Sequence, residues 1–183
     1  MANLNFKTAF KYPFNRAKGM WNVLWILLPI IGWFALGGYG VRIIQEFSKG
    51  KFKKLPVLKF KSDFKLGFFM FLKAIPFVLA YMLFMFVLNE IHSVLDHTRV
   101  LLEIFIVPIL TINFINKQTV GSFFEFKKLK YVFTNLGDYI VAVLKSILLF
   151  IVFLVMCLIL VGIPAMIFTE NMFLADFYRR KVK

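Results

Sequence analysis

The sequence lacks most of the residue patterns that mark an enzyme or a metal protein. Its single cysteine, Cys157, excludes an intrachain disulfide. It contains no HExxH or CxxC metal-binding pattern, no glycine-rich phosphate loop and no G-x-S-x-G nucleophile motif. We therefore expect a protein without enzymatic activity, cofactor or bound metal.

Charge is scarce and has mostly one sign. Charged residues make up 17% of the 183 positions, and 23 basic against 9 acidic residues give a net charge of +14. Hydrophobic residues make up 61%, and the mean hydropathy is +0.80. A soluble domain of this length could not cover so much apolar surface, so lipid must be the solvent for much of the chain. We expect a single multi-pass domain over residues 1–183 in the cell membrane. Its positive charge indicates anionic lipid as a partner, and no motif indicates nucleic acid.

Four apolar segments lead us to predict an all-α integral membrane fold with additional interfacial amphipathic helices. The segments cover approximately residues 19–41, 66–88, 100–115 and 139–169. At 1.5 Å per residue, the first is long enough to cross a hydrocarbon core of about 30 Å. Each segment contains one proline. Broken helices line the sites of many transporters, although membrane helices also tolerate proline without such a role.

The most basic stretch, Phe47–Lys65, holds seven lysines and one aspartate, with Phe or Leu between the charges. This alternation predicts a segment lying on a membrane, with apolar side chains inserted and ammonium groups among lipid headgroups. There are two alternatives to a membrane-lying segment: a solvated loop and a loop that binds an acidic partner protein. The predicted headgroup-binding residues come from this stretch and from a second basic link: Lys49, Lys51, Lys53, Lys54, Lys59, Lys61, Lys65, Lys127, Lys128 and Lys130.

Aromatic and basic residues alternate near the N-terminus. Phe6, Phe10 and Phe14 lie four residues apart and would share one face of a helix. We predict that they anchor an interfacial helix, with Trp21 and Trp25 as further interfacial anchors. A short disordered tail is the alternative.

Polar residues within or beside the apolar segments suggest two further tests. Lys73 and Lys145 each lie about two turns inside a segment, and we expect their ammonium groups to reach back toward the basic links. Burial of either beside Glu103 would instead favour ion coupling. His92 and Asp96 are four residues apart and could bind a metal from one helical face. No metal-ligand motif accompanies them, and a solvated polar link is the alternative.

Short motifs recur in the same order. FKKL occurs at 52–55 and 126–129, with LKAI and LKSI downstream and LLPII and IVPIL upstream. This order suggests two tandem two-span repeats, with chance similarity as the alternative. Four full crossings would place both FKKL links in the cytoplasm and both termini outside. Alternatively, the first and fourth segments turn back within the membrane, and every basic segment lies on the cytoplasmic side.

The first third of the chain carries an ordered set of residues: Tyr12-Pro13-Phe14, Trp21, Leu28-Pro29-Ile30, Gly38-Tyr39, Arg42, Gly50, Leu55-Pro56, Phe60, Phe64 and Gly67. Over about residues 12–67 it resembles a family of small prokaryotic membrane proteins, domain of unknown function 4013. The family's loop after Leu-Pro tends to be acidic, whereas here it is rich in lysine. The resemblance implies a polytopic fold in a prokaryotic membrane and implies no activity.

These observations favour a non-enzymatic accessory or membrane-organising subunit that binds anionic lipid and partner helices, in a homo-oligomer or with another membrane protein. The alternative is a transporter or channel component that acts as an oligomer. A water-accessible polar cavity at a proline break would favour transport, and lipid-filled grooves would favour an organising role.

Overall fold

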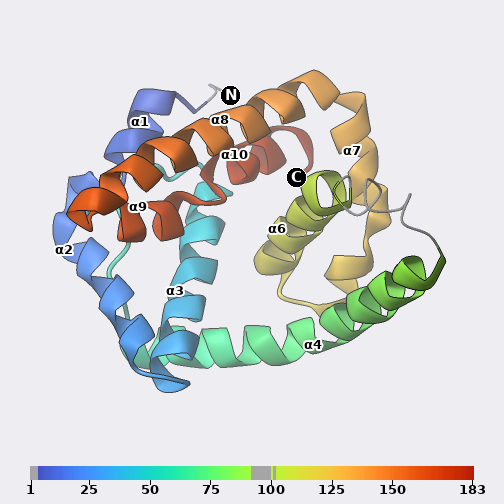
Figure 1. Ribbon diagram of the computed structural model, residues 1–183, viewed down its shortest axis with the longest axis horizontal. Coiled ribbons are helices and arrows are strands. Elements are labelled where there is room, and N and C mark those ends of the chain that lie inside the picture. The colour runs from blue at the N-terminus through green and yellow to red at the C-terminus, as the bar shows by residue number, and fades with distance from the viewer. Residues whose placement is uncertain (1–3, 92–99, 101) are drawn as a thin grey trace.

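The computed structural model describes residues 4–91, 100 and 102–183, and these residues form helices and loops without a strand. The all-α prediction is therefore confirmed. Figure 1 shows the two longest helices, α4 and α8, along opposite edges of the molecule. The helices are α1 Phe6–Lys11, η1 Phe14–Arg16, α2 Ala17–Met20, η2 Trp21–Leu27, α3 Ile31–Phe47, α4 Phe60–Ile91, η4 Leu102–Ile106, α6 Val107–Lys117, η5 Val120–Phe124, η6 Phe126–Lys128, α7 Leu129–Thr134, α8 Leu136–Met156, η7 Cys157–Ile159, α9 Gly162–Thr169 and α10 Met172–Lys181.

Two helical stretches are long and apolar enough to cross a membrane: Phe60–Val87 in α4 and Leu136–Ile159 in α8 and η7. Only 6% and 17% of their most apolar windows are buried inside the protein. The core helix of a soluble protein would be mostly buried, so these outward-facing apolar surfaces suit lipid contact. The residues that the structure describes thus provide two candidate spans, and four spans stay a prediction.

The first apolar segment reverses direction instead of continuing as one helix. The 3₁₀ helix η2 ends at Leu27, and Pro29 and Ile30 form a turn in which Ile30 has a positive φ of 64°. The chain then returns as α3. A Cβ atom on Gly32 would lie 1.8 Å from the Trp25 carbonyl oxygen, so only glycine allows the two arms to meet. Trp33 Nε1 also donates a hydrogen bond to the Ile26 carbonyl at 2.9 Å.

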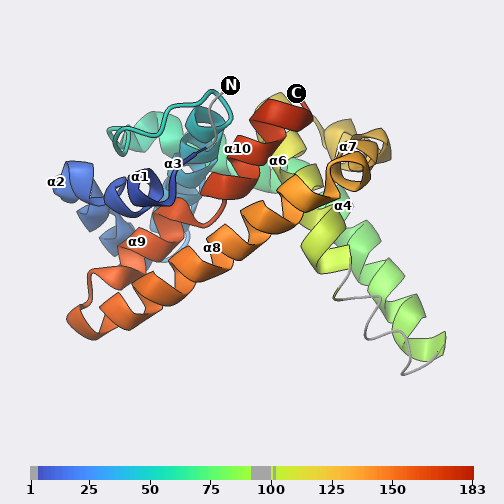
Figure 2. The ribbon, with the colours of Figure 1, turned by 90° about the horizontal axis from the view of Figure 1, so that it is seen from above.

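The fourth apolar segment also reverses. Helix α8 continues into η7, Leu160 adopts a positive φ of 60°, and α9 begins at Gly162. A Cβ atom on Gly162 would lie 2.0 Å from the Phe153 carbonyl oxygen, which again requires glycine at the turn. Figure 2 places this turn away from the C-terminal end of α10. The apolar segments at 19–41 and 139–169 are therefore each interrupted by a turn, and the chain has the reversals that the turn-back alternative requires.

Helices α3 and α4 pack closely through two glycines. A Cβ atom on Gly38 would lie 1.8 Å from the Asp63 carbonyl oxygen, and one on Gly67 would lie 1.9 Å from the Phe34 carbonyl oxygen. Small residues at both positions bring the two backbones into contact. Pro76 lies inside α4, which continues through it.

Lys73 and Lys145 point toward neighbouring elements and not toward acidic side chains. Lys73 Nζ donates to the Gln118 carbonyl at 2.9 Å, at the C-terminal end of α6, where a cation is favourable. Lys145 Nζ lies 6.0 Å from the ring centre of Phe173 in α10. Glu103 accepts a hydrogen bond from the Tyr81 hydroxyl at 3.0 Å. In the described part of the chain, neither lysine has the acidic partner that would indicate ion coupling.

The two FKKL motifs have different conformations. The first, at residues 52–55, lies in an irregular loop, whereas the second spans η6 and the start of α7. The tandem repeat therefore stays a prediction.

Candidate functional site

The basic segments of the chain meet on one side of the molecule, where they form what we call the basic layer: residues 4–18, 48–59, 117–130 and 176–183. The Leu4 amide donates to the Asp176 carboxylate at 3.2 Å, which joins the two ends of the chain. Asn15 donates to the Lys53 carbonyl at 2.6 Å, and Lys128 Nζ donates to the Val182 carbonyl at 3.0 Å. Figure 2 shows the C-terminal end of α10 on this side. Contacts between segments far apart in sequence thus gather the positive charge on one face.

The lysine-rich loop is folded onto the protein. Phe47 and Leu55 are each 1% exposed. Phe52 stacks on Phe47 with ring centres 5.7 Å apart, and the Arg179 guanidinium lies 5.8 Å from its ring centre. The predicted insertion of Phe47 and Leu55 into a membrane is therefore wrong. The core beneath the loop and helix α10 provide a nearer apolar surface for these side chains.

The lysines of the loop are exposed. All seven predicted headgroup ligands of this loop are exposed, and so are Lys127 and Lys130. Lys128 is half-buried, and its ammonium group donates a hydrogen bond to the Val182 carbonyl. The apolar residues explain the folding of the loop, and the lysines supply its outer charge. Their binding to lipid headgroups stays a prediction.

A basic hollow of about 390 Å³ lies between the loop and the N-terminal segment. Arg16, Lys51, Lys53 and Lys54 line it, together with the carboxylate-bearing Glu46. Arg16 Nη1 donates to the Leu55 carbonyl at 3.2 Å, which holds the loop against the N-terminal segment. Four cations against one acid suit a phosphate group. Arg16 was not among the predicted ligands, because only the folded loop brings it beside the lysines.

A buried ion pair anchors the end of this loop. The Arg42 guanidinium donates to both carboxylate oxygens of Asp63, at 2.9 and 2.6 Å, and Asp63 is 1% exposed. Asp63 also accepts from the Lys59 amide at 2.7 Å. Beside them, the Tyr39 hydroxyl donates to the Pro56 carbonyl at 2.9 Å. The only acidic residue of the lysine-rich stretch therefore has a structural role.

The predicted aromatic anchors have different surroundings. Phe6 stacks on Phe173 with ring centres 6.2 Å apart, and the rings of Phe10 and Phe14 lie 5.6 and 6.2 Å from that of Phe153. This packing by itself explains the four-residue spacing. Two tryptophans complete the set: Trp21 is 70% exposed, and the Trp25 ring lies 4.6 Å from that of Phe60. Membrane anchoring by these residues stays a prediction.

A polar network ties α6 to the second basic link and to α10. The Tyr178 hydroxyl donates to Asn113 Oδ1 at 2.6 Å, and Asn113 Nδ2 donates to the Ser122 carbonyl at 2.7 Å. Burial raises the pKa of Tyr178 to about 12. Hydrogen bonding from Lys117 lowers the pKa of the Glu125 carboxyl, which also accepts from Asn113.

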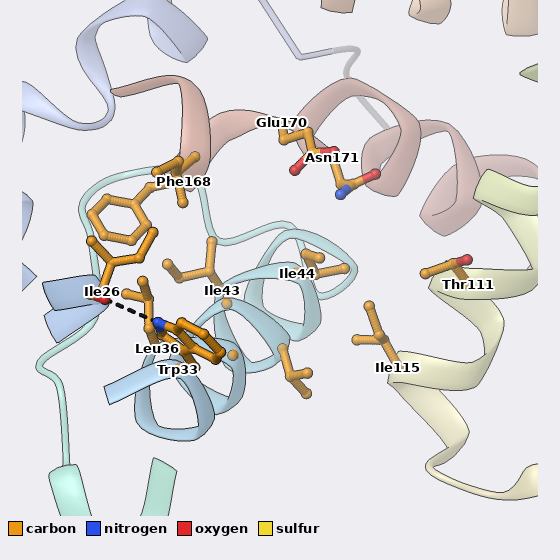
Figure 3. A pocket seen from close by; sticks show the side chains of 14 residues that line it. Ile26, Trp33, Leu36, Ile43, Ile44, Thr111, Ile115, Phe168, Glu170 and Asn171 are labelled. Carbon is orange, nitrogen blue, oxygen red and sulfur yellow. Dashed lines mark hydrogen bonds between the residues drawn. The ribbon is translucent and has the colours of Figure 1, made fainter. Parts of the chain in front are cut away.

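A central cavity of about 700 Å³ lies between α3, α6 and the α9–α10 junction. Its walls are mostly apolar, and its polar side chains are Thr111, Glu170 and Asn171. Figure 3 shows Glu170 and Asn171 beyond Ile43 and Ile44, on the opposite side from Trp33. The cavity is apolar along most of its length and therefore resembles a lipid-filled groove more than a polar conduction path.

The metal hypothesis for His92 and Asp96 concerns residues outside the described part of the chain. Within the described part, no group of three or more His, Cys, Asp or Glu side chains is placed to hold a metal ion.

A family model described as "Protein of unknown function (DUF4013)" matches residues 22–162. The chain belongs to this family. The match extends well beyond the resemblance seen over residues 12–67 and includes both candidate spans and the second FKKL link, while Tyr12-Pro13-Phe14 precedes it. The DUF4013 assignment carries no activity with it. No curated protein and no solved structure matches the chain.

Proposed function

We propose that this protein is a non-enzymatic, multi-pass component of the cell membrane that organises anionic lipid and partner helices. The basic layer would face the headgroups of one leaflet, α4 and α8 would lie in the hydrocarbon, and the two reversals would return the chain to the basic side. The observation that carries this proposal is the gathering of four basic segments on one face, while apolar side chains face outward along α4 and α8.

Electrostatic attraction between the lysines and anionic headgroups is expected to supply the binding energy. Each lysine near an anionic bilayer surface contributes about 1 kcal/mol, and salt weakens the attraction within the Debye length. The lysines of the loop are already exposed, so binding lipid does not require the loop to unfold. The basic hollow adds a place where one headgroup phosphate can contact Arg16 and the surrounding lysines together.

Partner helices or a second copy would bind along the outward faces of α4 and α8. Several large apolar residues on these faces are more than half exposed: Phe71, Met82 and Leu83 on α4, and Leu144 and Val155 on α8. The transporter or channel alternative would need a polar path through the protein or its oligomer, and the apolar central cavity favours the organising role over it.

The test uses purified protein in a neutral detergent, with thermal unfolding followed as lipid is added. We expect an anionic phosphatidylglycerol to raise the melting temperature more than a phosphatidylcholine with the same chains, because a ligand of the folded state stabilises it. Replacing Lys51, Lys53, Lys54, Lys59 and Lys61 with Gln should remove most of the difference. Replacing the same five with Arg keeps the charge and should retain it, and 0.5 M salt should weaken it. Equal shifts for both lipids, or a Gln variant that behaves like the native protein, would refute headgroup recognition by this loop.

A further inference from the structure

The central cavity runs along one face of α3. The α3 residues that line it are Trp33, Leu36, Gly37, Gly40, Val41, Ile43 and Ile44. Their spacing of three and four residues keeps them on one side of the helix. From Trp33 to Ile44 the face extends roughly 16 Å at 1.5 Å per residue. The volume of the cavity, about 700 Å³, falls within the range of small-molecule sites.

Two glycines keep this cavity open. A Cβ atom added to Gly37 or Gly40 would meet no atom within 4 Å, whereas Gly32 and Gly38 are forced by backbone contacts below 2 Å. A glycine inside a helix costs about 1 kcal/mol relative to alanine. Packing explains why Gly32 and Gly38 are glycines, but it does not explain Gly37 or Gly40. The need for space for an occupant of the cavity explains Gly37 and Gly40.

The cavity has a polar end and an apolar end. Figure 3 shows Glu170 and Asn171 on the side of Ile43 and Ile44, near the end of α3 that leads into the basic layer, and Trp33 on the other side. Within the described residues, the Glu170 carboxylate has neither a hydrogen bond nor an ion pair. An acidic group at the mouth of an apolar groove is complementary to a cation with a hydrocarbon tail.

We propose that the cavity binds one acyl chain of a membrane lipid whose head group carries a primary amine, with the ammonium group at Glu170 and the chain directed along Gly40 and Gly37 toward Trp33. This site is separate from the lysines of the basic layer, and it selects a different head group. The polar end of the cavity lies toward the basic layer, and its apolar end lies toward the turn before α3. A lipid bound in this way has its head group on the side of the basic layer and its acyl chain directed toward that turn.

Trp33 provides the readout. In a variant with Trp21→Phe and Trp25→Phe, Trp33 is the single tryptophan, and lipids with brominated chains quench its fluorescence on contact. The protein in neutral detergent is titrated with brominated phosphatidylethanolamine and, separately, with phosphatidylglycerol carrying the same brominated chains. We expect saturable quenching by phosphatidylethanolamine near one lipid per protein. Phosphatidylglycerol should give only a gradual, unsaturated decrease from lipid around the protein.

Three substitutions in this background test the geometry. Gly40→Leu places a side chain in open space within the cavity and should abolish the saturable component. Gly137→Leu, at a position in α8 that is equally open but outside the cavity, should leave it unchanged. Glu170→Gln should weaken the apparent affinity for phosphatidylethanolamine about tenfold.

Three results would overturn the proposal: unsaturated quenching by phosphatidylethanolamine, saturable quenching that persists in Gly40→Leu, or equal saturable binding of both lipids. The Glu170→Gln comparison decides the head group even if Gly40→Leu fails to fold. None of these results depends on the loop lysines, so failure here leaves the headgroup test of the basic layer unaffected.

Discussion

Arg42 and Asp63 form a bidentate ion pair that closes the base of the lysine-rich loop. The guanidinium joins the last third of α3 to the first turn of α4, and the same guanidinium donates to the Val57 carbonyl at 2.7 Å. Asp63 is almost fully buried, whereas the Arg42 side chain is 22% exposed. A buried carboxylate is tolerated here because one arginine and the Lys59 amide satisfy it.

Replacing Arg42 with Gln should therefore destabilise the protein substantially. The change leaves the Asp63 carboxylate buried without its counter-charge, for which we expect a loss of about 3 kcal/mol in the free energy of unfolding. Lys181→Gln is the matched control, because it breaks an ion pair with Asp138 in which both side chains are about one-third exposed or more. Thermal unfolding in detergent measures both variants. A melting temperature for Arg42→Gln as high as that of Lys181→Gln would contradict the structural role of the pair.

Neighbouring glycines in α3 should respond in opposite ways to alanine. Gly38→Ala introduces a Cβ atom that overlaps the α4 backbone, so the helices must separate, at a cost of about 1–3 kcal/mol or more. Gly37→Ala meets open space and should be neutral or stabilising by up to about 1 kcal/mol, because alanine favours helix. The difference between the two melting temperatures is the measurement. Similar values would mean that α3 and α4 do not pack through Gly38.

Stability should fall at alkaline pH. Burial raises the pKa of Tyr178 to about 12 and that of Tyr12 further, whereas an unfolded tyrosine ionises near 10. Above pH 10 the unfolded chain therefore releases phenolic protons that the folded protein keeps, and the free energy of unfolding decreases as pH rises.

Tyr178→Phe tests this contribution. It should reduce the pH dependence of unfolding between pH 10 and 11 by up to about 1.4 kcal/mol per pH unit, the value for one proton. Loss of the hydrogen bond to Asn113 lowers stability at every pH and does not change the slope. An unchanged slope in Tyr178→Phe would show that this phenol is not buried in the folded protein.

Composition and hydropathy were sufficient to predict an all-helical chain with apolar segments and basic links. They could not distinguish the roles of the prolines. Pro76 lies within a continuous helix, whereas Pro29 precedes a reversal. The difference depends on Gly32, which has no Cβ atom and lets the Trp25 carbonyl oxygen approach closely. That contact exists only once the chain has turned back.

The lysine-rich loop shows a second limit of sequence reasoning. Alternating lysines and apolar residues fit insertion into a membrane and packing onto a protein equally well. The choice depends on a partner more than 120 residues away, because Arg179 of α10 packs over Phe52. Arg16 was missed for the same reason, since its position beside Lys53 and Lys54 depends on the fold of the loop.

The central claim is that all basic segments lie on one side of the membrane, and cysteine accessibility tests it most directly. Single cysteines replace Lys11, Lys51, Lys127, Lys183 and, in the link between the second and third apolar segments, Ser93, each in a Cys157→Ser background. The variants are reconstituted into vesicles and treated with a membrane-impermeant maleimide before and after lysis. The account predicts the same labelled fraction at positions 11, 51, 127 and 183, and the complementary fraction at position 93. Labelling of positions 11 and 183 together with 93, opposite to 51 and 127, would show four full crossings and contradict it.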